Sequence, residues 1–326
     1  ERTPSKFIQK YAKGTQQEIA PEQRKAIQAT QNTPHKVIPG MLALAMEEGL
    51  GKEAILRIAG WTDSDSVHAV NKEAVEAQNQ NLENQFDLMM EMLEDPNNPE
   101  SYDQEFFVTQ EVWKNFRAGF TNQSLNMQTS KIHRAMFAKP SWEVTIDLNN
   151  PDHVTEYLIC VAMNVGAVKT DQQPNAQSLD KFWDKYKEGT SLHNAVKALQ
   201  KLNSPEGGAL TALETEAIVK EAKGEGMLAL QAMLSLAQYE QAKASGQTSF
   251  KTTMIVGADG KTNGPMLTIL ALGAMGDVDG MYTLLNRGGI YSTDEGQAEH
   301  YSQYYNTPEG MYLYEDLGTV MLTQAA

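Results

Sequence analysis

The sequence predicts an α-rich α+β fold, with a helical N-terminal region followed by a larger region that holds a small, mostly antiparallel sheet. Apolar residues recur at three- and four-residue steps through much of the chain, which is the spacing of one face of an α-helix. Shorter runs of β-branched and aromatic residues near 105–125, 142–146 and 250–257 indicate strands. We therefore expect a helical region over residues 1–100 and a sheet-containing region with helical insertions over residues 101–326.

The amino-acid composition excludes several classes of protein and several kinds of site. The chain has 326 residues, 41% of them hydrophobic, so it can bury a sizeable core. A formal net charge of -15 argues against a self-contained nucleic-acid-binding domain, which usually has a basic face. A single cysteine, Cys160, excludes an internal disulfide and any zinc site built from several cysteines. We expect no membrane span and no signal peptide, and the start at Glu1 suggests a piece of a longer protein.

The N-terminal region is expected to be helical after a loose basic arm. Pro21 is typical of the first turn of a helix, which we expect to be short. Residues 37–59 predict two helices of a hairpin, and residues 67–93 predict one long helix. The arm within residues 1–33 fits a solvated linker, and it also fits a contact with nucleic acid or a neighbouring chain.

The middle of the chain, residues 142–246, is expected to be mainly helical after a short strand at 142–146. One helix has an aromatic face whose side chains could stack on bases, although packing in a core is the more common role. The first expected helix starts at Pro151, and the next contains Phe182, Trp183 and Tyr186. The remaining expected helices are Ser191 to Leu202, Ala209 to Ala222 and Met227 to Ala244.

The most informative stretch is residues 251–266. A short buried strand, Phe250 to Val256, precedes two glycines, and Asp259 lies at the turn before an apolar helix from Met266 to Met275. A carboxylate on such a strand-to-helix turn is exposed on a rigid base, which suits a metal ligand. An ordinary turn aspartate beside glycine fits the same residues, so the pattern alone leaves both roles open.

A second stretch, residues 105–134, combines aromatic and β-branched residues with two short polar motifs. These are Arg117-Ala118-Gly119-Phe120 and Asn126-Met127-Gln128-Thr129. The helix that follows carries Lys131 and Arg134, whose three-residue spacing places them on one face, and Lys139 comes shortly after them. They fit phosphate contacts, though amphipathic helices commonly carry such pairs, and Arg117 fits either a nucleic-acid contact or a surface ion pair.

Both stretches resemble motifs of single-subunit phage RNA polymerases, in the form used by the virion-packaged polymerases of schitoviruses. Ala258 to Pro265 matches the first catalytic-aspartate motif of that family, A-D-G-x-T-N-G-P, at every specified position. The second family motif, x-x-Gly-Arg followed by Asn-Pro-Gln-Ser/Gly, is matched at Gly119, at residues 126, 128 and 129, and departed from at Phe120. A basic-Gly-Gly run at residues 287–291 agrees in position, so the resemblance spans nearly the whole chain.

The resemblance implies a palm domain and nucleotidyl transfer assisted by Mg²⁺ held between two aspartates. Asp259 would be the catalytic residue and the first metal ligand, with the carbonyl of Gly260 as a further hard oxygen donor. Asp259 should also approach the 117–128 segment across the palm. The nucleic-acid-binding or nucleotide-binding residues implied are Arg117, Asn126, Gln128, Lys131, Arg134, Lys261 and Asn263.

The family places its second aspartate and a Lys/Tyr helix well downstream of this motif, and the residues after Asp259 hold no counterpart. The chain would therefore be the N-terminal and palm part of the enzyme, inactive alone. The implied partners are a DNA template, single-stranded or with a hairpin promoter, ribonucleotides, the rest of the polymerase chain and other virion ejection proteins. The implied location is the virion, inside the capsid, with delivery into the host cytoplasm on infection.

Two other functions stay open. A virion structural or genome-ejection protein could use a polymerase-like scaffold without catalysis, which Phe120 and the acidic composition favour. An unrelated helical enzyme could use Asp259 as a lone metal ligand or acid-base group, which the order of the motifs disfavours.

Overall fold

The computed structural model describes residues 9–93, 105–114, 118–122, 125, 127–168, 175–202, 208–254 and 275–276, without the side chains of 175–178. Contacts divide the chain into one unit of Glu1–Ala167 with Leu179–Val256 and a second of Val168–Ser178 with Gly257–Ala326. The fold below is that of the first unit. The division into regions 1–100 and 101–326 stays a prediction.

The fold is α-rich α+β, as the sequence predicts. The described helices are α1 Pro21–Gln31, α2 Pro39–Ala45, α3 Gly51–Ala59, α4 Lys72–Leu93, α5 Lys131–Met136, α6 Pro151–Asn164, α7 Asn175–Tyr186, α8 Ser191–Leu202, α9 Ala212–Lys223 and α10 Met227–Ala244. The described strands are β1 Lys36–Val37, β2 Gln110–Val112, β3 Ala118–Phe120, β4 Phe137–Ala138, β5 Val144–Asp147 and β6 Ser249–Thr252.

Local signals in the sequence set where the helices begin. Helices α1, α2 and α6 each have proline in the first turn, where its missing N–H costs nothing. Helix α9 begins at a capping box, in which Thr211 and Glu214 satisfy each other's backbone N–H groups. The long helix predicted over 67–93 begins at Lys72, because two 3₁₀ turns, Ser64–Ser66 and Ala69–Asn71, precede it.

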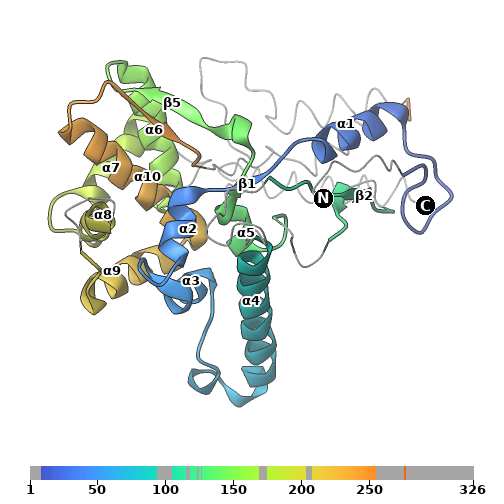
Figure 1. Cartoon of the computed structure of the whole chain (residues 1–326), viewed down its shortest axis with the longest axis horizontal. Helices are drawn as coiled ribbons and strands as arrows, with labels where there is room; N and C mark the ends of the chain where they lie inside the picture. Colours follow the sequence, from blue (N-terminus) through green and yellow to red (C-terminus); the bar gives the residue numbers. More distant parts are fainter. Residues whose placement is uncertain are drawn as a thin grey trace. The chain divides into compact units, whose positions relative to one another are not determined.

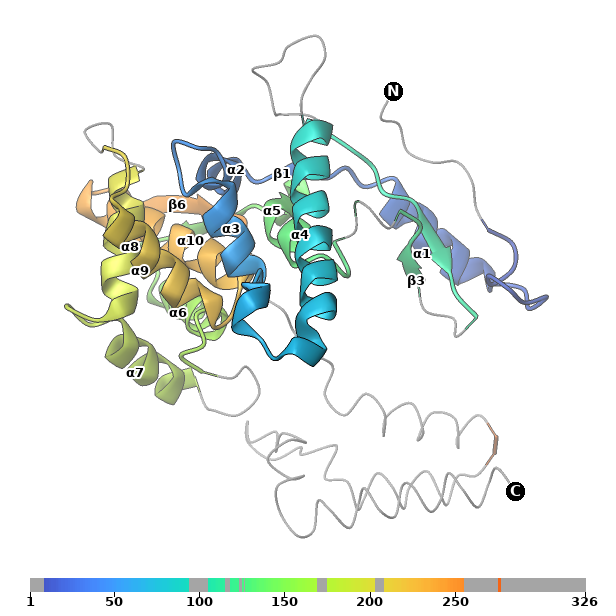
Figure 2. The same ribbon diagram turned by 90° about the horizontal axis from the view of Figure 1, so that it is seen from below.

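Helix α10 is the centre of the core. Its residues from Leu230 to Ala237 are all buried, which is the pattern of a helix surrounded on every side. Helices α8, α9 and α6 pack against it, and α5, α3 and α2 contact it from the N-terminal half of the chain (Figures 1 and 2). Two chain halves that are distant in sequence therefore share one core.

Helix α4 connects this core to the segment that carries the second motif. It buries one stripe of residues, Leu82, Phe86, Met89 and Leu93, and contacts both α3 and α5 (Figure 2). Apart from two alanines, its exposed residues are polar or charged, as expected for a surface helix.

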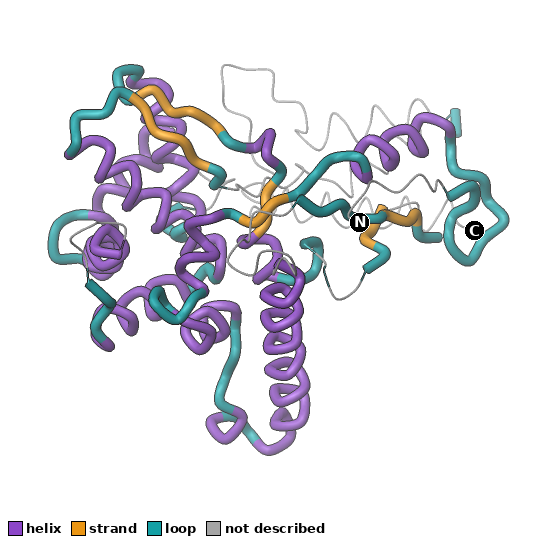
Figure 3. Tube along the Cα trace, viewed as in Figure 1, coloured by secondary structure: helices purple, strands orange, loops and turns teal. Residues whose placement is uncertain are grey.

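The described strands form three two-stranded antiparallel sheets instead of the one small sheet that we expected (Figure 3). β1 pairs with β4, β2 with β3, and β5 with β6, the last in a register that aligns Ile146 with Phe250. Within the described part of residues 105–125, β2 and β3 pair with each other as a local hairpin with three residues in each strand. Phe106, before β2, forms an isolated bridge with His35. The strands near 144 and 250 do pair, as the single-sheet arrangement requires.

Candidate functional site

The structure describes three of the residues that the sequence predicts for the site, namely Gln128, Lys131 and Arg134. The others lie outside the described residues, and their roles stay predictions, as does the approach of Asp259 to the 117–128 segment. These others are Arg117, Asn126, Asp259, Gly260, Lys261 and Asn263.

Arg134 ties the polar turn before α5 to the helix itself. Its Nε donates to the carbonyl of Met127 at 3.2 Å, and its terminal N–H donates to the carbonyl of Gln128 at 2.5 Å. The turn and the first residues of α5 thus form one rigid unit. Lys131 and Arg134 are both exposed, so each can meet a ligand from solvent.

Buried hydrogen bonds fix α5 against α4. Ser130 caps α5 by accepting from the His133 N–H at 3.2 Å, and its hydroxyl donates to Gln85 Oε1 at 2.7 Å. His133 is fully buried, with Nε2 3.0 Å from the Gln85 carbonyl. Burial lowers the pKa of His133, so its imidazole is neutral at neutral pH and contributes no charge to the site.

A pocket of about 360 Å³ lies beside this unit, and Met127, Gln128 and Arg134 line it. It brings Gln128 and Arg134 together with Lys139, a further basic residue that the sequence offered as a phosphate contact. Phe120 and Trp142, which the sequence analysis did not assign as binding residues, line the same pocket. Its other lining residues are Thr30, His35, Gln110, Ala118 and Phe137. The pocket therefore has aromatic and basic groups on neighbouring walls.

The positive charge of this pocket comes from Arg134 and Lys139. The Lys139 ammonium lies 5.2 Å from the centre of the Trp142 ring, within cation–π distance. Burial, together with repulsion by Lys139, lowers the pKa of His35 to about 4, so His35 is neutral at neutral pH. Within the described ranges, no carboxylate makes an ion pair with Arg134 or Lys139.

Gly119, which precedes Phe120, is required by close packing. A Cβ atom at this position would lie 2.1 Å from Cζ2 of Trp113, far inside van der Waals contact. The indole of Trp113 is itself held by donation from Nε1 to Glu111 Oε1 at 3.0 Å. The glycine of the second motif thus lets the β2–β3 hairpin close over Trp113, and this places Phe120 at the pocket.

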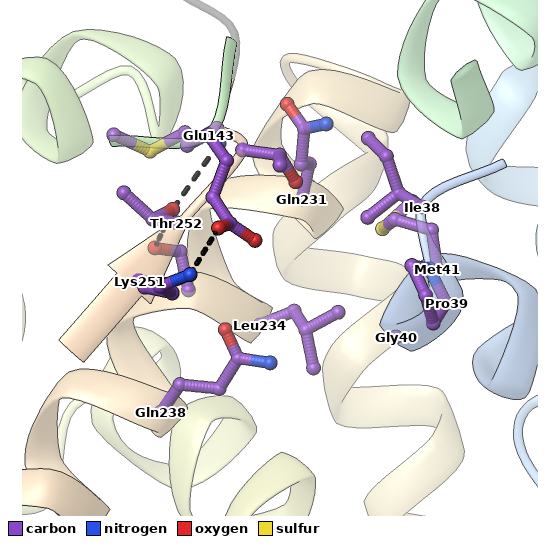
Figure 4. Close-up of a pocket in the computed structure, with 13 residues that line it drawn as sticks. Ile38, Pro39, Gly40, Met41, Glu143, Gln231, Leu234, Gln238, Lys251 and Thr252 are labelled. Carbon is purple, nitrogen blue, oxygen red and sulfur yellow. Dashed lines mark hydrogen bonds and ion pairs between the residues drawn. The ribbon is translucent and has the colours of Figure 1, made fainter. Parts of the chain in front are cut away.

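A second pocket, of about 240 Å³, lies at the end of β6 (Figure 4). Lys251 Nζ and Glu143 Oε1 form an ion pair of 2.6 Å at its edge, and Thr252 lines it from the same strand. The rest of its wall is formed by residues 38–41, residues 253–254 and the α10 residues Gln231, Leu234, Ser235 and Gln238. The pocket adjoins the segment that leads toward Asp259.

Over the residues whose side chains the structure describes, no group of three or more His, Cys, Asp and Glu side chains is placed to hold an ion. Asp259 and Gly260 are not among them, so the magnesium site stays a prediction. No helix in the described part of the chain is both long and apolar enough to cross a membrane.

A comparison with protein families matches residues 22–137 to the virion DNA-directed RNA polymerase domain. A comparison with curated proteins found no match. The matched segment begins within α1, ends within β4 and includes Gln128, Lys131 and Arg134. The match confirms, for this part of the chain, the resemblance drawn from the sequence motifs, and it supports the N-terminal part of a virion RNA polymerase.

Proposed function

We propose that this chain, in which residues 22–137 match a virion RNA polymerase domain, supplies the N-terminal and palm part of a phage virion DNA-directed RNA polymerase. The family match is the observation that carries this proposal. The aspartate motif at 258–265 lies outside the matched residues, so it supports the same conclusion independently.

The described residues contribute binding surface in this proposal. Arg134 and Lys131 are exposed on α5, and Arg134 holds the carbonyls of the turn that contains Gln128. Cationic side chains on a rigid unit suit phosphate contacts. Arg117 and Asn126, which lie in the same two sequence motifs, would add further contacts to nucleic acid.

The chemistry would be nucleotidyl transfer at Asp259. Asp259 and the carbonyl of Gly260 offer the hard oxygen donors that Mg²⁺ prefers, and the ion, when bound, neutralises charge on the transferring phosphate. Lys261 and Asn263 would face the incoming ribonucleotide. A lone aspartate cannot organise two ions, so the second aspartate and the fingers would come from the rest of the polymerase chain.

The substrates and location follow from this assignment. The template would be DNA, single-stranded or with a hairpin promoter, and the protein would reside inside the capsid and enter the host cytoplasm on infection. Other virion ejection proteins would be its neighbours there. Because the net charge of this chain is -15, other segments of the polymerase would supply most of the positive surface of the template channel.

A second candidate function is a catalytically inactive virion structural or genome-ejection protein on the same scaffold. The observation that favours it is Phe120, which lines the pocket at the position where the family motif has arginine. Phenylalanine cannot supply the charge of that arginine.

The deciding experiment is template-dependent ribonucleotide incorporation with Mg²⁺ by the full-length protein. The Asp259→Ala variant is compared with Asp180→Ala, which removes an exposed carboxylate from α7. We expect incorporation by the parent and by Asp180→Ala, and none by Asp259→Ala. Equal incorporation by all three would remove Asp259 from the site. A folded parent without activity would favour the structural or ejection protein.

A further inference from the structure

Trp142 is an exposed aromatic residue at a basic pocket. The side chain lies at the end of the 3₁₀ turn Pro140–Trp142, and 43% of the residue remains exposed. Lys139, the residue before this turn, lies over the Trp142 ring. An indole has two faces, and the exposed part of Trp142 offers a planar ligand a surface on which to stack.

The positive charge of Arg134 and Lys139 near Trp142 favours an anionic ligand. Arg134 donates two of its N–H groups to the carbonyls of Met127 and Gln128. A guanidinium has five N–H donors in total, so it has further donors for an anion. The acidic residue next to Trp142 in the sequence is Glu143, which is paired with Lys251 at 2.6 Å. The pocket thus has a local excess of positive charge in a chain whose net charge is -15.

The size of the pocket limits the ligand. A volume of about 360 Å³ is near the lower end of the range for small-molecule sites, which begins at roughly 300 Å³. This suits one base with its phosphate. Phe120 adds a second aromatic wall, and Gln128 lines the same space.

We propose that the pocket formed by Phe120, Arg134, Lys139 and Trp142 binds one nucleotide unit of a single-stranded nucleic acid. The base stacks on the exposed surface of Trp142, while Arg134 and Lys139 contact the adjacent phosphates. Stacking on an aromatic side chain tolerates any base, because every base has a π-face. In this arrangement Phe120 supplies aromatic surface where the polymerase motif has a charge.

This inference rests on the proposed function only in requiring that the chain bind nucleic acid. It requires no nucleotidyl transfer, so binding is measured on the full-length protein carrying Asp259→Ala. Absence of ribonucleotide incorporation by the parent, together with binding that depends on Trp142, would then remove the enzyme assignment alone. Incorporation by the parent without a role for Trp142 in binding would remove this inference alone.

The experiment measures the affinity of fluorescent oligothymidylate and oligouridylate of equal length by anisotropy. We expect Trp142→Ala to weaken binding by about 5- to 150-fold, the range of one stacked base, and Trp142→Phe to restore most of it. Trp183→Ala is the matched control, because Trp183 is 44% exposed on α7, lies outside the pocket and packs its ring against Phe182 and Tyr186. The two oligonucleotides distinguish a DNA ligand from an RNA ligand.

An abasic oligodeoxynucleotide separates stacking from charge. It keeps the phosphates, so it should bind more weakly than the intact strand and should be insensitive to Trp142→Ala. Lys139→Gln should lower the salt slope of binding by about 0.7. Its control is Lys243→Gln, since Lys243 lies over the Tyr239 ring at 5.1 Å, outside the pocket.

Three results would overturn the inference. These are no binding of either oligonucleotide, binding that is unchanged by Trp142→Ala, and an equal loss for intact and abasic strands on Trp142→Ala. The last would show that Trp142 supports the fold of the pocket without touching a base.

Discussion

Ser235 Oγ lies 2.8 Å from Thr252 Oγ1 and thereby joins the central helix α10 to strand β6. The Tyr157 hydroxyl lies 3.0 Å from the same Ser235 oxygen, and Thr252 Oγ1 accepts from the Met254 N–H at 3.1 Å. Burial raises the pKa of Tyr157, so its hydroxyl stays protonated. This chain of hydroxyls fixes the backbone just past β6, in the segment that leads toward Asp259.

Replacing Ser235 should therefore destabilise the fold. The Ser235→Ala variant leaves the buried Tyr157 hydroxyl without this partner, and an unsatisfied buried polar group costs about 1–3 kcal/mol. We expect a loss of that size in the free energy of unfolding, measured by urea denaturation. Ser245→Ala is the control, because Ser245 is exposed and its hydroxyl bonds only within the end of α10. Equal stability of the two variants would contradict the structural role of the hydroxyl groups of Tyr157, Ser235 and Thr252.

Gly119→Ala should open the β2–β3 hairpin. The new methyl group would meet the Trp113 ring, and overpacking of this kind costs about 1–3 kcal/mol in the free energy of unfolding. Gly224→Ala is the matched control, since Gly224 has helical backbone angles and open space around its Cα. That control should be neutral or more stable by up to about 1 kcal/mol. A loss confined to Gly224→Ala would refute the packing argument for Gly119.

Helices with strong local signals were predictable from the sequence. The bounds expected for Ser191 to Leu202 and Met227 to Ala244 are those of α8 and α10, because apolar periodicity and flanking glycines are local features. The strand expected at 142–146 lies at 144–147, because Pro140 starts a 3₁₀ turn that continues through Trp142. Strand bounds depend on a distant partner, here β6, and periodicity carries no information about that partner.

The candidate site was predictable only in part, for a similar reason. Gln128 and Arg134 were identified from a motif, and they do line one pocket. Lys139 and Trp142 belong to no motif, and they reach the pocket because β4 pairs with β1 and a 3₁₀ turn follows. The available signal was the short spacing of a lysine and a tryptophan around a proline, which is common in surface turns as well.

The pH dependence of stability should report on His35. The pKa of its imidazole is about 4 in the folded chain and 6.5 when unperturbed, so the unfolded chain binds the proton first as the pH falls. Stability from this group is complete above pH 6.5 and is lost between 6.5 and 4, by an amount of the order of 3 kcal/mol. His133, whose pKa is also lowered, acts in the same direction.

Urea denaturation at a series of pH values measures this loss. The slope of stability against pH should be reduced in His35→Gln and retained in His153→Gln, which replaces an exposed histidine on α6. An unchanged slope in His35→Gln would show that other groups cause the acid destabilisation.

Phe120→Arg should convert the pocket from one with two cations to one with three. Because Phe120 lines the same space as Arg134 and Lys139, the new charge adds a phosphate contact. We expect tighter binding of single-stranded oligonucleotides and a salt slope steeper by about 0.7. Leu213→Arg makes the same change in net charge at an exposed site on α9 and should leave both unchanged. Phe120→Leu is a second control, because it removes the aromatic ring, as Phe120→Arg does, but adds no charge. Equal effects of the two arginine variants would mean that overall charge, and not the position of Phe120, governs binding.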